Sequence, residues 1–180
     1  MDRPGAGTTT LRRARADDVP AIESLMAESM RVLFPAFYDA EQTASSVRHF
    51  ASLDRILIAD GTYLVIEAGG VLVACGGWTR RERLPHGSEG EPRILDPETE
   101  PARIRQMFVR PEWTRRGLAT RLLEAGEAAA REAGYRRLEL GATLAGEPVY
   151  LRFGFREIER IDIPLPDGLS IAGVLMAKPI

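Results

Sequence analysis

The stretch that decides the fold is Ala102–Glu127, which reads ARIRQMFVRPEWTRRGLATRLLEAGE. Its first part alternates along the chain and ends at Pro111, as strands do, because successive side chains of a strand point to opposite faces. The two faces carry Ile104, Gln106 and Phe108 on one side and Arg105, Met107 and Val109 on the other. Since both faces hold apolar residues, the pattern predicts a central β-strand.

The second part of the stretch has apolar residues at helical spacing and predicts an amphipathic helix that runs to about Ala133. Gly134 follows and is a typical helix stop. The stripe expected to face the core is Leu118, Leu122, Gly126, Ala129 and Ala133, and the residues expected outside are Glu124, Glu127, Arg131 and Glu132. A short strand, RRLELGA, comes next, so the helix is a crossover and the two strands are predicted to be parallel neighbours.

The turn between this strand and this helix concentrates positive charge and small residues. A helix start offers unpaired backbone N–H groups and the positive end of the macrodipole, which together favour a bound phosphate. Arg115 and Arg116 add positive charge. Gly117 and Ala119 let an anion approach the backbone, and Thr120 can add a hydroxyl. The alternative is a solvated turn that only precedes a helix. The glycine patterns of kinase-type and dinucleotide-binding loops are both missing.

The rest of the chain predicts the other elements of a mixed α/β fold. A strand in TTLRRARADD opens it, and a helix over Val19–Ser29 follows. A second, weaker helix is predicted in AEQTASSVRHFASL. Gly69 and Gly70 separate two apolar runs and predict a β-hairpin, because a tight turn needs positive φ. Arg80–Pro101 is rich in charge, Gly and Pro and is expected to be a functional loop. A short helix in EPVYLRFGF and two strands joined at 166–168 complete the order βαα, ββ, βα, βα, ββ.

The composition predicts one cytoplasmic domain without a disulfide, a metal site or a membrane segment. A chain of 180 residues suits a single core, so 1–180 is expected to be one domain with 1–7 as a frayed tail. Acidic residues (26) outnumber basic ones (24), which argues against a nucleic-acid partner. Cys75 is the only cysteine, and two isolated histidines cannot build a zinc site. No apolar run approaches the roughly 20 residues of a membrane span.

Three motifs together resemble those of the GNAT N-acetyltransferase superfamily. IRQMFVRPEWTRRGLATRLL looks like its acyl-coenzyme A binding motif, a strand ending in Val-x-Pro followed by Arg-Arg-Gly-x-Gly/Ala and a helix. GEPVYLRFGF resembles the next motif, and LRRARADDVPAIESLM is similar to the usual opening strand and helix. The likeness covers almost the whole chain in the expected order. The departures are Thr114 in place of a Gln or Arg, Ala119 in place of a second glycine, and no Asn ahead of the short helix.

The resemblance implies a mixed, mostly antiparallel sheet of about seven strands, flanked by about four helices and splayed between the fourth and fifth strands. It also implies acetyl-CoA as co-substrate, with the pantetheine arm along the end of the fourth strand and the diphosphate in the turn after it. The cofactor-binding residues expected on this basis are Phe108, Val109, Arg115, Arg116, Gly117, Leu118, Ala119 and Thr120.

Tyr150 matches the position that in this superfamily donates a proton to the departing thiolate, so the resemblance implies that it is catalytic. Its spacing also fits a buried ring with its hydroxyl on a backbone carbonyl. The general base is not readable from the pattern, although Glu98, Glu100 and His86 precede the fourth strand. Cys75 in an apolar strand favours core packing over a role as acyl-carrying nucleophile.

The resemblance therefore predicts an enzyme that moves an acetyl group from acetyl-CoA to a primary amine of a small molecule or protein, by direct attack of the neutral amine. The alternative is an acyl-CoA-binding sensor of the same fold without turnover. The aromatic loop LFPAFYD is expected to flank the acceptor pocket or to pack in the core. The fold alone does not specify the acceptor. The C-terminal strands offer a surface for a homodimer.

Overall fold

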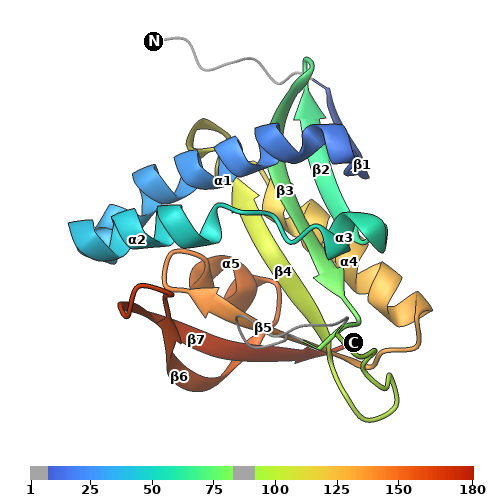
Figure 1. Ribbon diagram of the computed structural model, residues 1–180. Coiled ribbons are helices and arrows are strands. Elements are labelled where there is room, and N and C mark those ends of the chain that lie inside the picture. The colour runs from blue at the N-terminus through green and yellow to red at the C-terminus, as the bar shows by residue number, and fades with distance from the viewer. Residues whose placement is uncertain (1–7, 83–91) are drawn as a thin grey trace.

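The computed structural model describes residues 8–82 and 92–180. These residues form one seven-stranded sheet covered by helices (Figure 1). The strands are β1 (Thr9–Arg13), β2 (Tyr63–Ala68), β3 (Val71–Thr79), β4 (Ala102–Val109), β5 (Arg137–Thr143), β6 (Arg156–Pro164) and β7 (Ser170–Pro179). The α-helices are α1 (Val19–Leu33), α2 (Ala40–Phe50), α3 (Ile56–Ala59), α4 (Leu118–Glu132) and α5 (Glu147–Arg152). The tail expected at 1–7 lies outside the described residues.

The sheet has the order β1-β2-β3-β4-β5-β7-β6. Every neighbouring pair is antiparallel except β4 and β5, which are parallel as the crossover predicts. These two strands pair only at Ala102↔Leu138 and Arg103↔Glu139, and then separate. The mixed, mostly antiparallel fold with a splay between β4 and β5 is therefore confirmed. The single-turn helix α3 adds one helix to the four expected.

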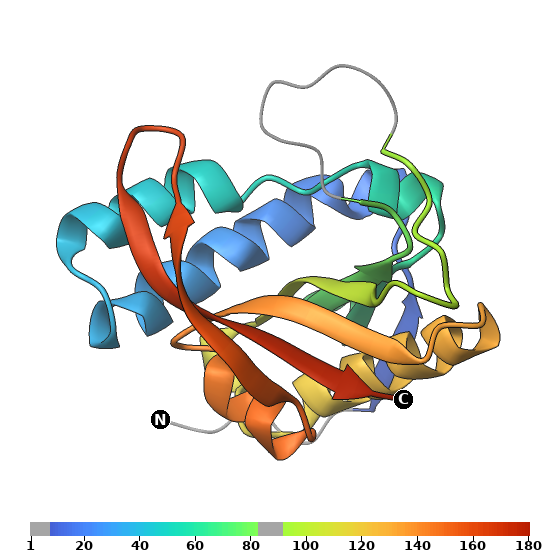
Figure 2. The same ribbon diagram turned by 90° about the horizontal axis from the view of Figure 1, so that it is seen from below.

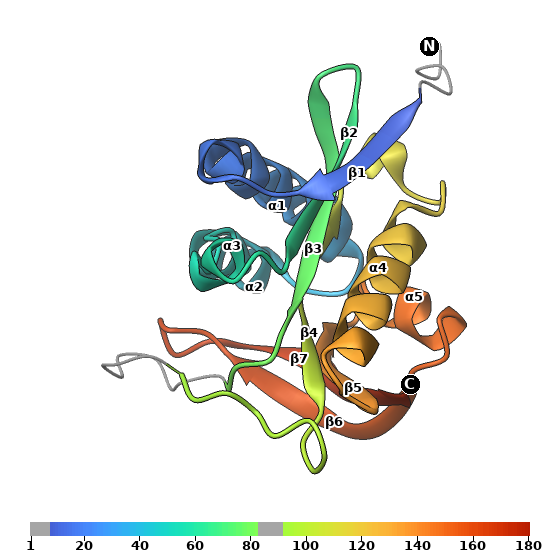
Figure 3. The same cartoon turned by 90° about the vertical axis from the view of Figure 1, so that its right-hand side faces the viewer.

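Helices lie on both faces of the sheet (Figure 3): α1, α2 and α3 on one face, α4 and α5 on the other. One core cluster packs beneath the first group and includes Ile22, Met26 and Tyr63. A second cluster packs beneath α4 and includes Leu123 and Leu138. Strand β3 is buried along nearly its whole length, because it runs through the middle of the sheet with both faces covered. The central part of the sheet therefore offers a rigid support for the end of β4.

The predicted hairpin and helix stop are both confirmed. Gly69 and Gly70, between β2 and β3, have φ of +56° and +81°. Gly134, just after α4, has φ of +92°. Positive φ is costly for residues with a side chain, which explains glycine at these turns.

The prediction for α4 is wrong at one position of its outer face, Glu127, and at one position of its inner stripe, Ala133. Glu127 is only 7% exposed, whereas Ala133 is exposed. The end of β7 brings Lys178 against the Glu127 carboxylate, and Arg131, one turn along the helix, also pairs with it at 2.7 Å. An acidic residue is stable at this buried position because it has two cationic partners. The helical period alone does not indicate a partner that lies fifty residues away.

The predicted alternation along β4 is also wrong, because the strand contains a bulge. Cys75 of β3 faces Phe108, but Gly77 faces Arg105, so two residues of β4 stand opposite one of β3. Gln106, one of the extra pair, has φ of +49°. As a result Ile104 packs on the α4 side together with Met107, and not on the side of Phe108.

The described end of the Arg80–Pro101 loop is packed, although residues 83–91 lie outside the described part of the chain. Leu95 is 2% exposed, and its carbonyl accepts a hydrogen bond from the Tyr135 hydroxyl at 2.7 Å. Among residues 8–82 and 92–180, no helix is long and apolar enough to cross a membrane.

The β6–β7 hairpin leans over the splayed part of the sheet and reaches α2 (Figure 2). At its tip the Ser45 hydroxyl donates to the Asp167 carboxylate at 2.5 Å. Gln42 Nε2 donates to the Ser170 carbonyl at 2.8 Å. The tip of the hairpin is therefore attached to α2. Strand β6 remains an exposed edge of the sheet, and dimerisation through it stays a prediction.

Candidate functional site

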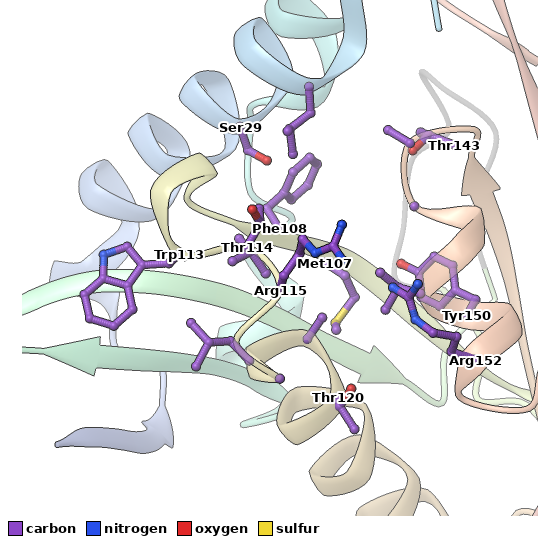
Figure 4. A pocket seen from close by; sticks show the side chains of 18 of the residues that line it. Ser29, Met107, Phe108, Trp113, Thr114, Arg115, Thr120, Thr143, Tyr150 and Arg152 are labelled. Atoms are coloured by element: carbon purple, nitrogen blue, oxygen red, sulfur yellow. The ribbon is translucent and has the colours of Figure 1, made fainter. Parts of the chain in front are cut away.

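A cavity of about 330 Å³ opens where β4 ends, between the first turn of α4 and helix α5 (Figure 4). Both strands that part at the splay contribute to its wall, β4 through residues 107–109 and β5 through Thr143. The other lining residues are Ser29, Leu33 and Phe34 from α1 and the turn after it, 113–115 and 117–120 around the start of α4, and Ala145, Gly146, Val149, Tyr150 and Arg152 around α5. All the predicted site residues except Arg116 line this cavity.

The turn ahead of α4 has an uncommon backbone conformation. Gly117, the N-cap residue, has φ of +77°, and Arg115 has φ of +61° although it carries a side chain. A left-handed residue other than glycine costs about 1–2 kcal/mol, and such strain is typical of ligand-binding turns. Among the described residues no side chain caps the helix, and a Cβ on Gly117 would meet nothing within 4 Å. The first N–H groups of α4 therefore lack a side-chain partner there, and residues 117–120 line the cavity, as an anion site requires.

The two arginines of the turn behave differently. Arg115 lines the cavity. Arg116 lies over the Trp113 ring, with its guanidinium carbon 4.6 Å from the ring centroid, and it donates to the Glu112 carbonyl at 3.1 Å. A role for Arg116 in cofactor binding therefore remains a prediction, and Arg115 is the cation of this turn that faces the cavity.

The bulge in β4 is held by contacts outside the strand. The Gln106 side chain donates to the Ser52 carbonyl at 2.8 Å and accepts from the Asp54 N–H at 3.1 Å. The Gln106 carbonyl accepts from the Tyr63 hydroxyl at 2.7 Å. These three bonds fix the backbone just ahead of Met107 and Phe108, where β4 enters the cavity wall.

Tyr150 lies on α5 with its ring against Phe155, edge to face, at a centroid distance of 5.8 Å. Within the described part of the chain its hydroxyl makes no hydrogen bond, so the bond to a backbone carbonyl considered from the sequence does not form. Burial raises the pKa of Tyr150 above its usual value near 10. The hydroxyl therefore stays protonated at neutral pH and faces the cavity as a proton donor.

The acidic residues considered as a general base are not at the cavity. Glu100 lies just before β4, at the opposite end of that strand from the cavity. It pairs with both terminal nitrogens of Arg93, at 2.7 and 2.6 Å, and this contact lowers the pKa of Glu100 to about 2. Glu98 lies in the same segment and is exposed, and His86 lies outside the described residues. Among the described residues no Asp, Glu or His lines the cavity.

Cys75 lies within a core cluster and is fully buried. Burial raises the pKa of its thiol to about 12, so the thiolate needed for attack is scarce at neutral pH. The packing role is the one that this environment supports.

Several lining residues are not indicated by the sequence pattern. Ser29 of α1 is 4% exposed, its hydroxyl has no hydrogen bond within the described residues, and Figure 4 shows it directed to the Phe108 side of the cavity. Arg152 ends α5 on the opposite side. A serine inside a helical apolar face and an arginine in a short helix carry no motif that would indicate these contacts.

Tyr38, from the loop between α1 and α2, bridges the chain at the ends of two neighbouring strands on one side of the splay, β5 and β7. Its hydroxyl accepts from the Leu144 N–H and donates to the Ala172 carbonyl, both at 2.8 Å. Leu144 begins the segment that leads from β5 to α5. The aromatic loop thus packs in the core and also supports the wall of the cavity.

Comparison with known proteins gives a consistent result. The model of the acetyltransferase (GNAT) family matches residues 22–155. None of the curated proteins compared with the chain matches it. Among solved structures, a GCN5-related N-acetyltransferase from Rhodopseudomonas palustris superposes with a TM-score of 0.75 at 20% identity, covering 96% of each chain.

Two further structures contain the expected ligand. The PaiA N-acetyltransferase of Thermoplasma acidophilum, in complex with coenzyme A, has a TM-score of 0.70 at 17% identity and covers 96% of this chain and 99% of its own. The Salmonella typhimurium protein yncA, with its cofactor acetyl-CoA, has a TM-score of 0.64 at 18% identity and covers 96% and 94%. These likenesses show the fold, and the family match adds the membership. The chain belongs to the GNAT acetyltransferase family, whose co-substrate is acetyl-CoA.

Proposed function

We propose that this protein transfers an acetyl group from acetyl-CoA to a primary amine of a small molecule or protein, by direct attack of the amine on the thioester. We also propose that residues 1–180 act as one domain. The observation that carries the proposal is the cavity that brings together the first turn of α4, the end of β4 and Tyr150.

The donor would bind along the strand and the turn after it. The N–H groups of residues 117–120 and the Arg115 guanidinium would hold its diphosphate. The pantetheine arm would pair with backbone groups of Phe108 and Val109 in the manner of an added strand. Leu118, Ala119 and Thr120 shape this part of the wall, and their small or apolar side chains leave room for the arm.

The gap between β4 and β5 would hold the reacting carbonyl. The amine nitrogen attacks the carbonyl carbon, and a backbone N–H near the bulge of β4 stabilises the oxyanion. The C–S bond then breaks and the sulfur takes a proton from the Tyr150 hydroxyl. The nitrogen of the new amide releases one proton to water, and Tyr150 recovers its proton from solvent. Burial keeps the Tyr150 hydroxyl protonated, so the proton is present when the thiolate leaves.

The amine must lose a proton before it attacks. An alkyl ammonium with a pKa near 10 is only about 0.1% deprotonated at neutral pH. Since no carboxylate or imidazole of the described residues lines the cavity, we assign the proton to a water path and not to a named residue.

Thiol release from acetyl-CoA, measured over a panel of primary amines, tests the proposal. We expect release that depends on the amine, and about a 100-fold lower kcat for Tyr150→Phe, the magnitude typical of losing a general acid. Tyr135→Phe is the matched control, because the Tyr135 hydroxyl bonds to Leu95 away from the cavity and should not affect turnover.

Two results would count against the enzyme. If calorimetry detects no binding of coenzyme A by the folded protein, the donor site is wrong. If coenzyme A binds but no amine promotes thiol release, the sensor alternative is favoured.

A further inference from the structure

The charge of the cavity wall differs from that of the whole protein. The chain has a net charge of -2. The described lining, however, contains two arginines, Arg115 and Arg152, and no Asp or Glu. Arg115 enters from the turn before α4 and Arg152 from the end of α5, so the two guanidinium groups belong to opposite walls (Figure 4).

Neither arginine is neutralised by a residue that the structure describes. Within the described part of the chain, Arg115 and Arg152 form no ion pair and no side-chain hydrogen bond. The carboxylate of α5 itself, Glu147, is taken by Arg160 of β6, with nitrogen–oxygen distances of 2.7 and 3.0 Å. The Glu147 carboxylate, the acidic group of α5, therefore pairs with Arg160. The Arg152 guanidinium stays available to a ligand in the cavity.

Two cations that face one cavity without a counter-ion repel each other, and a bound anion removes this cost. Arginine is well suited to this, because its planar group donates two parallel hydrogen bonds to a phosphate. The side of the cavity opposite Arg152 already presents the free N–H groups of α4. An anion placed between them would have donors on both sides.

We infer that Arg152 binds the phosphate groups of the donor from the α5 side, so that the bound donor bridges α4 and α5. This inference rests on the proposed function and adds a residue to its binding site. Tyr150 is two residues before Arg152 on the same short helix. Phosphate binding would therefore also position the hydroxyl that protonates the leaving sulfur, which makes Arg152 a positioning residue as well as a binding residue.

The test measures the affinity of the full chain for coenzyme A and for pantetheine, which lacks the phosphates, by calorimetry. Arg152→Gln should weaken coenzyme A binding about tenfold to a hundredfold and leave pantetheine binding unchanged, as expected for the loss of a charged hydrogen-bonding partner. Arg152→Lys should lose less of the affinity for coenzyme A, since lysine keeps the positive charge but lacks the planar guanidinium group.

Arg137→Gln is the matched control, because Arg137 is exposed at the start of β5, away from the cavity, and its loss changes the net charge equally. Arg152 is exposed, so thermal unfolding of Arg152→Gln should match the wild type.

The outcomes separate this inference from the proposed function. Coenzyme A affinity equal to that of the wild type in Arg152→Gln would overturn the role of Arg152 and leave the enzyme intact. An equal loss for pantetheine, or an equal loss of coenzyme A affinity in Arg137→Gln, would overturn it too. Failure of the wild-type protein to bind coenzyme A would instead overturn the proposed function.

Discussion

Replacing Tyr38 with phenylalanine removes one hydroxyl that bridges β5 and β7 just beyond the last pair of their ladder. The ladder between β5 and β7 ends at Thr143↔Gly173, and the next pair would join Leu144 to Ala172. The Tyr38 hydroxyl bonds to both of these residues, at 2.8 Å each, and so takes the place of the next ladder bond. The ring would stay in place against Phe34, at a centroid distance of 5.1 Å, so only polar groups are affected.

The expected change in the free energy of unfolding depends on the two backbone groups that lose their partner, the Leu144 N–H and the Ala172 carbonyl. A hydrogen bond between neutral groups contributes about 0.5–1.5 kcal/mol, and a buried donor without a partner costs about 1–3 kcal/mol. Ala172 is exposed and its carbonyl can bond to water, whereas the Leu144 N–H is half-buried. We therefore expect Tyr38→Phe to lower the free energy of unfolding by about 2 kcal/mol, measured by urea unfolding at 25 °C.

Tyr135→Phe again provides the control, because it removes a single buried bond to Leu95. It should cost about 1 kcal/mol and leave turnover unchanged. Tyr38→Phe should also lower kcat, since Leu144 leads into the helix that carries Tyr150. The reasoning is refuted if the free energy of unfolding of Tyr38→Phe stays within about 0.5 kcal/mol of the wild type.

Two further predictions concern buried polar groups. Ser29→Ala removes a hydroxyl that has no partner in the described structure, so stability should not fall, but calorimetry should show several-fold weaker coenzyme A binding; unchanged affinity would mean that no ligand group meets this hydroxyl. Lys178→Met leaves Glu127 with Arg131 as its remaining partner and should lower the free energy of unfolding by about 2–3 kcal/mol in urea. Adding Glu127→Leu should recover most of this loss, and no recovery would show that the buried charge is not its cause.

Much of the fold could be predicted because its signals are local. A strand that ends at Pro111, a glycine turn and an amphipathic helix follow one another within about twenty residues, and each depends on neighbouring residues alone. The hairpin at Gly69 and Gly70 is equally local. The same holds for the part of the site around Arg115 and Gly117, because the N–H groups that face the cavity belong to the turn itself.

The errors have a common physical cause. The alternation of β4 is interrupted at Gln106 by bonds to Ser52, Asp54 and Tyr63, all more than forty residues away. The outer face of α4 is misassigned at Glu127 because its partner comes from β7. In both cases the local repeat, of the strand or of the helix, is recognised correctly. A contact with a residue far away in the sequence then changes which side chain is buried.

The sequence by itself therefore determined the order of the elements, the family resemblance and the phosphate-type turn, because adjacent residues control backbone conformation. Only the tertiary structure decided which side chains share the cavity. Ser29 and Arg152 are more than a hundred residues apart, and they meet the end of β4 only because the sheet splays and α1 and α5 pack on either side of the gap. Contacts between residues so far apart in the sequence depend on packing over the whole core, which no local sequence pattern determines.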